Sequence, residues 1–332
     1  MTALVPTAFA HDAPGAEADP CAVPRMRTDR RPGAGGPPTE VSVGIRMADL
    51  TDIDDVHQTL TGDFAVFLSW NDPRLDGLEG CRVPLDDVWT PGLRFVNSGR
   101  LFTSQPEEVV MGPGGAVQYL QRYYGSLATY HNLRQFPFDD QTFVITLVSL
   151  EYGEEDVRLS ADQQVTGRRD LLNISAWTVT SVEGRTRRQF IEATDTTALA
   201  YDFRISANRQ RHFYLWKIIV PLCLIVFMSW TVFWVNPAQF GPQIGLSATS
   251  MLTLIAFQFA TTSMVPELGY FTTLDEFITG STIVVFLALV QSLTTSYLVS
   301  QGKEARALRM DRFSRYVFPL AYVALILVVF FR

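Results

Sequence analysis

Residues 244–265, IGLSATSMLTLIAFQFATTSMV, form an apolar span that carries polar side chains along its whole length. About 20 residues are enough for a helix to cross the roughly 30 Å of hydrocarbon in a bilayer. The polar residues of this span are Ser247, Thr249, Ser250, Thr253, Gln258, Thr261, Thr262 and Ser263. Lipid does not tolerate such groups without partners, so the span is expected to face protein or water. Water in the middle of a membrane indicates a pore.

Three further apolar spans of similar length accompany this one, all within roughly the last 120 residues of the chain. The sequence predicts helices at about residues 213–235, 243–265, 276–300 and 312–331. Together they form a predicted transmembrane domain over residues 212–332, surrounded by membrane lipid. The polar front half, residues 40–211, is long enough to build a core of its own.

The short connections between the spans set the orientation. The connection after the third span is basic, with Lys303, Arg306, Arg309, Arg312 and Arg315 against Glu304 and Asp311. Glu267 follows the second span. Because short basic loops stay in the cytoplasm, the N-terminal domain and the C-terminus are both predicted to lie outside.

The front half is acidic and rich in strand signals. Residues 40–211 contain 25 acidic and 16 basic residues, a balance of −9, which argues against nucleic acid as a partner. Alternating segments recur at intervals of about 8–15 residues between turn residues, which is typical of an all-β domain. The predicted strands are Val41–Ile45, Phe64–Leu68, Val117–Leu120, Phe143–Val148, Trp177–Val182 and Tyr201–Ile205. A β-sandwich is the simplest fold for this pattern.

Residues 1–39 are predicted to be a leader. Leu4–Ala10 ends in Ala8-Phe9-Ala10, which resembles a signal-peptidase site, but the apolar run is short and no basic segment precedes it. A clipped signal peptide and an unstructured tail therefore both stay open. Ala13–Pro38 is rich in Pro, Gly and Ala, which indicates a flexible segment.

The three cysteines give a weak signal. Cys21 and Cys81 could pair in an oxidising compartment. Because Cys21 lies in the leader, two unpaired cysteines are expected instead of a structural disulfide. Cys223 falls in the first span, where a buried free thiol is expected.

No catalytic constellation is present in the sequence. It contains no Gly-rich phosphate loop, no His-x-x-x-His or Cys-x-x-Cys pair and no Gly-x-Ser-x-Gly turn. The acid pairs Asp54-Asp55 and Glu154-Glu155 indicate solvated loops or, more weakly, a cation site. The sequence therefore predicts neither an enzyme nor a resident cofactor or metal.

Several local motifs occur together in a defined order. They are Trp70-Asn-Asp-Pro-Arg-Leu75, Val88-Trp-Thr-Pro-Gly-Leu-Arg-Phe-Val-Asn97, Phe136-Pro-Phe-Asp-Asp-Gln141, Arg209 and Leu215–Leu222 with Pro221 inside the first span. This pattern closely resembles the pentameric ligand-gated ion channels of the Cys-loop receptor superfamily. The short third-to-fourth connection resembles the prokaryotic branch. The resemblance implies a homopentamer in a bacterial plasma (inner) membrane, an extracellular β-sandwich and a ring of subunits whose second helices line the pore.

The chain departs from the family at two sites. The paired cysteines of the family would fall at Thr129 and Phe143, so that disulfide is missing. Two wall positions of the aromatic cage that binds ammonium ligands in animal receptors become Ala65 and Leu150. The remaining candidates for ligand binding are Leu150, Trp89, Phe190 and Tyr201 on one face, and Phe67 and Tyr119 on the opposing face. Each aromatic ring is equally consistent with a place in the sandwich core.

Spacing defines a stripe on the second span. Gly245, Thr249, Leu252, Ala256, Phe259 and Ser263 recur at steps of four and three residues, and Gln243 precedes them at the cytoplasmic end. These seven residues are predicted to line the pore. Rings of Leu252 and Phe259 would form a hydrophobic gate that closes by dewetting. The alternative is that the small and hydroxyl residues help the helices to pack.

Charge near the pore predicts the permeant ion. The family usually places a glutamate at the cytoplasmic mouth of its cation channels, whereas Gly241-Pro242-Gln243 carries no charge here. Glu267 at the outer mouth, beneath an acidic domain, favours cations such as Na⁺ and K⁺. An anion-selective channel of the same fold and a membrane-anchored sensor that does not conduct are the alternatives.

Coupling between the two halves is predicted at the membrane boundary. The resemblance pairs Asp139, in the Phe136-Pro137-Phe138-Asp139 loop, with Arg209. That pair would carry strain to Pro266–Tyr270, and Thr273-x-x-Glu276 fits a capping box that begins the third helix. The stimulus is predicted to be either protons, because His131 and His212 fall near this boundary, or a small amine or other organic agonist.

Overall fold

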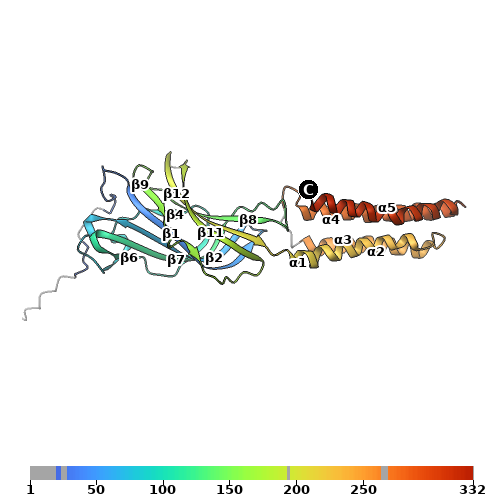
Figure 1. The fold of residues 1–332 in the computed structure, drawn as a ribbon, viewed down its shortest axis with the longest axis horizontal. Helices are drawn as coiled ribbons and strands as arrows, with labels where there is room; N and C mark the ends of the chain where they lie inside the picture. Colours follow the sequence, from blue (N-terminus) through green and yellow to red (C-terminus); the bar gives the residue numbers. More distant parts are fainter. Residues whose placement is uncertain (1–19, 24–27, 193–194, 263–267, 332) are drawn as a thin grey trace, which may run out of the picture.

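The computed structural model describes residues 20–23, 28–192, 195–262 and 268–331 of the chain. A strand-rich domain is followed by four helices that lie side by side at one end of an elongated molecule (Figure 1). The predicted architecture of a β-sandwich and four apolar, membrane-length helices is confirmed.

The strands form two sheets. The larger has eight strands in the order β10-β1-β2-β7-β6-β3, with β5 paired to β7 and β9 paired to β1. The smaller has four strands in the order β11-β12-β8-β4. The strands are β1 (Thr39–Asp54), β2 (Thr59–Asn71), β3 (Arg82–Pro84), β4 (Leu93–Phe95), β5 (Ser98–Thr103), β6 (Glu108–Met111), β7 (Ala116–Ala128), β8 (Asp140–Ser149), β9 (Val157–Ala161), β10 (Gly167–Arg168), β11 (Trp177–Ile191) and β12 (Thr196–Arg209). Short 3₁₀ helices, η1 (Pro73–Leu75), η2 (Leu85–Asp87) and η3 (Pro113–Gly115), join some of them.

The core lies between the two sheets. Every second side chain of β2 from Leu60 to Trp70 is buried, as expected for a strand with one face on a core. Phe143 of β8 and Phe203 of β12 are buried in the same core from the other sheet. All six predicted strands fall within observed strands, because the period-2 pattern marks which face is buried.

The segment before β1 corrects two predictions. Cys21 and Cys81 form a disulfide, so the expectation of two unpaired cysteines was wrong. Arg31 is buried, and its guanidinium donates to Asp156 and to the backbone carbonyls of Gly36 and Pro37. A flexible leader is therefore wrong for the described residues 20–23 and 28–38, because the disulfide of Cys21 and the buried guanidinium of Arg31 attach these two stretches to the sandwich. The Leu4–Ala10 stretch lies outside the described residues.

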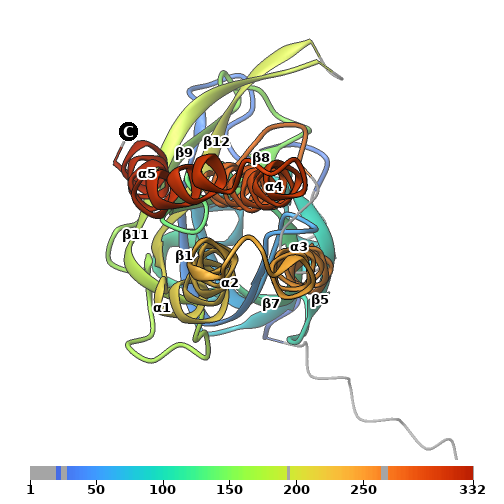
Figure 2. The same cartoon turned by 90° about the vertical axis from the view of Figure 1, so that its right-hand side faces the viewer.

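Four helical spans follow the sandwich. The first runs through α1 (His212–Tyr214), the π-turn η4 (Leu215–Ile219), α2 (Val220–Trp230) and the 3₁₀ turn η5 (Thr231–Trp234). The π-turn lies just before Pro221, whose backbone nitrogen carries no hydrogen and cannot donate a hydrogen bond. The others are α3 (Phe240–Thr262), α4 (Thr273–Ser300) and α5 (Glu304–Phe330). Seen end on, α2 and α3 lie on one side, and α4 and α5 on the other (Figure 2).

The helix boundaries differ from the predictions at two points. α5 begins at Glu304 and not near residue 312, so Arg306, Arg309 and Arg312 lie on its first turns and not in a loop. The capping box of α4 uses Thr272 and Asp275 in place of Thr273 and Glu276. The Asp275 side chain accepts from the Thr272 backbone N–H at 3.0 Å, while the Thr272 hydroxyl accepts from the Asp275 N–H at 3.1 Å. The register therefore shifts by one residue.

Candidate pore and coupling site

One face of α3 is exposed in the single subunit. Leu252 and Phe259 expose 67% and 78% of their surface, and Gly245, Thr249 and Ala256 are exposed on the same face. Ser250 and Leu254, on the other side of the helix, are fully buried. Five residues of the predicted stripe thus share one unpartnered helix face.

Gln243 does not belong to that face. Its side chain is fully buried, and its amide oxygen accepts from the Ser296 hydroxyl at 2.8 Å. Two residues before Gly245, it is rotated by about 200° around the helix, so the structure contradicts its assignment as pore-lining. The predicted residues Ser263, Pro266 and Glu267 lie outside the described part of the chain.

Other polar groups of α3 serve helix packing. The Ser247 hydroxyl donates to Ser292 at 2.8 Å, and the Gln258 amide donates to Thr282 at 2.7 Å, both on α4. The packing interpretation therefore holds for the polar residues turned toward α4. It does not explain Thr249, which lies on the exposed face.

At the membrane end of the sandwich, Arg209 at the end of β12 is clamped between two carboxylates. Its Nε donates to Asp139 Oδ1 at 2.8 Å and one Nη donates to Asp139 Oδ2 at 3.0 Å, a bidentate pair. The same Nη donates to Asp55 Oδ1 at 3.0 Å. The guanidinium also stacks over the Trp177 ring at 4.1 Å. Burial would lower the pKa of Arg209, but its hydrogen bonds to Asp55 and Asp139 outweigh burial and raise it.

Asp55 and His131 extend this network. His131 is fully buried, with Nδ1 3.2 Å from Asp55 Oδ1 and Nε2 2.8 Å from the Thr129 hydroxyl. Burial acts to raise the pKa of Asp55, but hydrogen bonds to His131 and Arg209 hold it below its ordinary value. The prediction of a solvated loop was therefore wrong for Asp55. No signal in the sequence joined it to a partner 154 residues away.

The Phe136–Asp139 loop contacts three of the membrane spans. Phe136 is fully buried against the Tyr214 ring of the first span, and its carbonyl accepts from the Leu274 N–H of α4 at 3.2 Å. Phe138 packs against Phe330 near the end of α5, at 5.4 Å between ring centroids. The peptide bond before Pro137 is cis.

The link before α4 is joined to the same loop region. The backbone N–H of Leu133 donates to the Tyr270 hydroxyl at 3.1 Å, and Arg134 lies over the Tyr270 ring. The structure thus brings together the predicted coupling residues Phe136, Pro137, Phe138, Asp139, Arg209 and Tyr270.

The predicted ligand residues divide into three groups. Trp89 and Tyr201 are fully buried, with Trp89 Nε1 donating to the Tyr152 hydroxyl at 2.9 Å, so the structure contradicts their place in an open cage. Both lie in the sandwich core, which was the alternative interpretation of these large aromatic side chains. Phe190 and Leu150 are exposed, at 58% and 47% of their surface.

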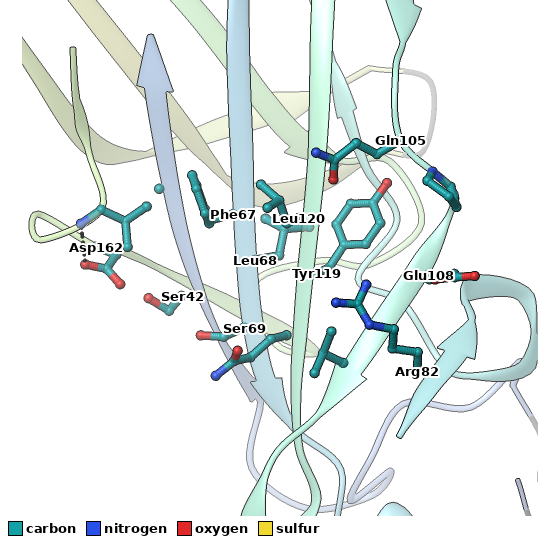
Figure 3. Close-up of a pocket in the computed structure, with 15 residues that line it drawn as sticks. Ser42, Phe67, Leu68, Ser69, Arg82, Gln105, Glu108, Tyr119, Leu120 and Asp162 are labelled. Carbon is teal, nitrogen blue, oxygen red and sulfur yellow. Dashed lines mark hydrogen bonds between the residues drawn. The ribbon is translucent and has the colours of Figure 1, made fainter. Parts of the chain in front are cut away.

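Phe67 and Tyr119 lie together. They line one hollow of about 440 Å³, which we call the outer hollow, with Arg82, Glu108 and Leu120 also on its wall (Figure 3). Phe67 and Leu120 lie on the face of β2 and β7 that points away from the sandwich core. Tyr119 pairs across the strands with Leu68 and belongs to the sandwich core at 8% exposure, so of the two predicted residues only Phe67 presents its side chain on this outward face.

Comparisons with known proteins follow the same division of the chain. The family model of the neurotransmitter-gated ion-channel ligand binding domain matches residues 25–211. The family model of the neurotransmitter-gated ion-channel transmembrane region matches residues 218–310. The chain belongs to this family. It is a ligand-gated ion channel of the Cys-loop superfamily, an integral membrane protein with an extracellular domain, and not an enzyme.

Two relatives illustrate the range of the family. The channel is 27% identical over 292 residues to a proton-gated ion channel of Gloeobacter violaceus, covering 86% of this chain and 81% of that protein. It is 25% identical over 302 residues to the gamma-aminobutyric acid receptor subunit beta-4 of Gallus gallus, covering 86% of this chain and 61% of that protein.

Proposed function

We propose that five copies of this chain form a cation-selective channel of the prokaryotic branch, in a bacterial plasma membrane, with ions crossing along α3. The observation that carries the proposal is the exposed face of α3, where Thr249, Leu252 and Phe259 lie in line. If this face contacted lipid, the Thr249 hydroxyl would have no polar surroundings. Five such faces arranged in a ring would instead enclose water. Rings of Leu252 and Phe259 then close the path by excluding water.

Charge placement supports an orientation with both termini outside. Arg306, Arg309 and Arg312 gather on the first turns of α5, at the end of the bundle remote from the sandwich (Figure 1). Short basic segments favour the cytoplasm. The contact between Phe138 and Phe330 supports placing the C-terminus on the same side as the sandwich.

Cation selectivity rests on Glu267 and on the acidic extracellular domain. We expect Glu267→Lys to shift the reversal potential toward that of the anion in asymmetric NaCl. Selectivity for chloride in the unmodified channel would favour the anion-selective alternative. The absence of current from purified protein in bilayers, under every stimulus, would favour the non-conducting sensor.

Protons are the stimulus that the buried network favours. With a neutral His131, Asp55 and Asp139 outnumber Arg209 by one charge, and a protonated imidazole would balance the cluster. Histidine ordinarily changes charge between pH 5 and 8. The two ring nitrogens of His131 face Asp55 and the Thr129 hydroxyl, and Asp55 is shared between His131 and Arg209. A small organic agonist at the outer hollow is the second candidate, and the outward-facing side chains of Phe67 and Leu120 on its wall favour it.

A pH-step recording without any ligand separates the two stimuli. We expect steps from pH 7.5 to 5 to open the channel and His131→Gln to abolish or strongly shift that response. His57→Gln is the matched control, because His57 belongs to the neighbouring turn but is largely exposed and pairs only locally with Asp54. An unchanged pH response in His131→Gln would exclude the buried imidazole as the sensor.

A further inference from the structure

A cluster of polar side chains lies inside the four-helix bundle, at the end remote from the sandwich. α3 and α5 begin at this end, and α4 finishes there (Figure 1). We call it the inner cluster. All of its members except the half-buried Gln291 are buried, and none lies on the exposed face of α3. The members are Gln243 and Ser247 on α3, Gln291, Ser292, Thr295 and Ser296 on α4, and Asp311 on α5.

Asp311 carries the carboxylate of this cluster. The sequence placed it in the connection before the fourth span, whereas it lies two turns into α5, with 1% of its surface exposed. Neither of its oxygens accepts a hydrogen bond from the described residues. Burying a carboxylate without donors or a counter-charge is costly, so this group needs an explanation.

The neighbouring polar groups already use their protons in other bonds. Thr295, Gln291 and Gln243 are the polar side chains beside the Asp311 carboxylate. The Thr295 hydroxyl donates to the Gln291 carbonyl of its own helix at 3.2 Å. The Gln243 amide donates to Thr295 at 3.4 Å and accepts from Ser296 at 2.8 Å. These bonds join the helices, and none of them neutralises Asp311.

Basic side chains do not pair with this carboxylate either. Arg315, one turn further along α5, attracts Asp311, but its Nε donates to the Phe233 carbonyl at 3.0 Å and its guanidinium lies over the Trp234 ring. Arg312, next to Asp311 in the chain, is exposed. The facing helices bring no charge, because residues 240–262 and 277–300 contain no Asp, Glu, Lys or Arg. The counter-charge of Asp311 therefore has to come from a bound group.

The inner cluster offers oxygen atoms, the ligands that alkali cations prefer. Asp311 supplies its two carboxylate oxygens, and the Thr295 hydroxyl keeps a lone pair. The Gln291 amide nitrogen is buried without a partner, and half a turn of the amide presents its oxygen instead. Divalent ions such as Ca²⁺ are usually held by several carboxylates, and the described residues contain no group of three or more His, Cys, Asp or Glu that could hold a metal. A single carboxylate matches the charge of a monovalent cation.

We propose that the inner cluster of each subunit binds one monovalent metal cation, Na⁺ or K⁺, between α3, α4 and α5. The Asp311 carboxylate balances the charge of the ion, and the oxygens of Thr295 and Gln291 form part of its coordination shell. Because Gln243 lies on the first turn of α3, the ion joins α5 to the inner end of the helix that lines the pore in the proposed function.

The melting temperature of the purified full-length protein tests this proposal and needs no current. It is measured in the chlorides of Na⁺, K⁺ and N-methyl-D-glucamine at equal ionic strength, because a ligand that binds the folded state alone raises the melting temperature. We expect Na⁺ or K⁺ to raise it by about 5 °C over the bulky organic cation, and the larger rise identifies the preferred ion. Equal melting temperatures in the three salts would overturn the proposal. A dependence on pH alone that Asp311→Asn removes would also overturn it, because a proton would then hold the carboxylate.

Variants place the ion. Asp311→Asn should remove the response to Na⁺ and K⁺, whereas Glu304→Gln, on the exposed first turn of α5, should keep it. Gln243→Lys keeps Asp311 and places an ammonium group beside it, so it should melt equally late in all three salts. This second variant decides the test if Asp311→Asn does not assemble. A response to Na⁺ or K⁺ that persists in Asp311→Asn or in Gln243→Lys places the ion elsewhere and makes the proposal wrong. Because stability is measured, a protein that responds to the ion but carries no current contradicts the proposed function alone.

Discussion

Removing the Arg209 guanidinium should destabilise the protein and uncouple the sandwich from the membrane helices. The Arg209 side chain is 1% exposed, and its two partners, Asp139 and Asp55, are 3% and 14% exposed. Arg209→Gln keeps much of the side-chain volume but leaves both carboxylates without their main counter-charge. His131 remains beside Asp55, while Asp139 keeps the Gln141 amide, at 2.7 Å, as its remaining side-chain partner among the described residues.

The size of the effect follows from burial. Breaking a buried ion pair by removing one partner costs about 3–5 kcal/mol. For a domain of this size, that loss corresponds to a fall in melting temperature of about 6 to 20 °C. Arg211→Gln is the matched control, because Arg211 and Asp140 are 50% and 60% exposed and lie 3.7 Å apart. An exposed pair of this kind contributes about 1 kcal/mol at most.

Two measurements follow the effect. The melting temperature is read as loss of the assembled peak in size-exclusion chromatography after heating, and gating is read as current in response to pH steps or ligand. We expect Arg209→Gln to melt early and to lose gating, with Arg211→Gln close to the wild type. An Arg209→Gln channel that melts within 2 °C of the wild type and opens normally would refute the coupling role.

Two further predictions concern stability. The folded-state pKa of Asp55 lies below its ordinary value of 3.8, so its contribution to stability is present above that pH and is lost as the pH falls through the lower value. The difference in stability between the wild type and Asp55→Asn should therefore narrow as the pH falls below about 4. A difference that stays constant as the pH falls from 5 into the acid range would contradict this. Replacing both Cys21 and Cys81 with Ser should lower the free energy of unfolding by about 4 kcal/mol, because the disulfide joins residues that are 60 positions apart. Cys223→Ser should change the free energy of unfolding little, since Cys223 is a free cysteine. Equal melting curves for the double variant and the wild type would contradict this prediction.

Local patterns predicted much of the fold and part of the site. The alternation in residues 64–68 and 201–205 gave strands of both sheets, because one face of each is buried. The four-and-three spacing from Gly245 to Phe259 gave the exposed face of α3 for a similar reason. The pairing of Asp139 with Arg209 came from the family motif and is present in the structure.

Long-range partners were not predictable in the same way. Asp55 follows another aspartate in a turn, and only the folded chain brings it to Arg209. Trp89 and Tyr201 suit a ligand cage and a core equally well, and burial alone distinguishes the two. Cys21 lies in a stretch rich in Pro, Gly and Ala, a composition that indicates a flexible segment and gives no sign of the disulfide with Cys81.

Thiol accessibility along α3 tests most directly whether this helix lines a water-filled pore. Single cysteines at positions 249 and 252, as Thr249→Cys and Leu252→Cys, are compared with Ser250→Cys and Leu254→Cys on the buried side, all in a Cys223→Ser background. With the channel stimulated, a charged methanethiosulfonate reagent should react at 249 and 252 and change the current, and should leave 250 and 254 unmodified. Protection of 249 and 252 during stimulation, or equal reaction at all four positions, would contradict a pore formed by this face.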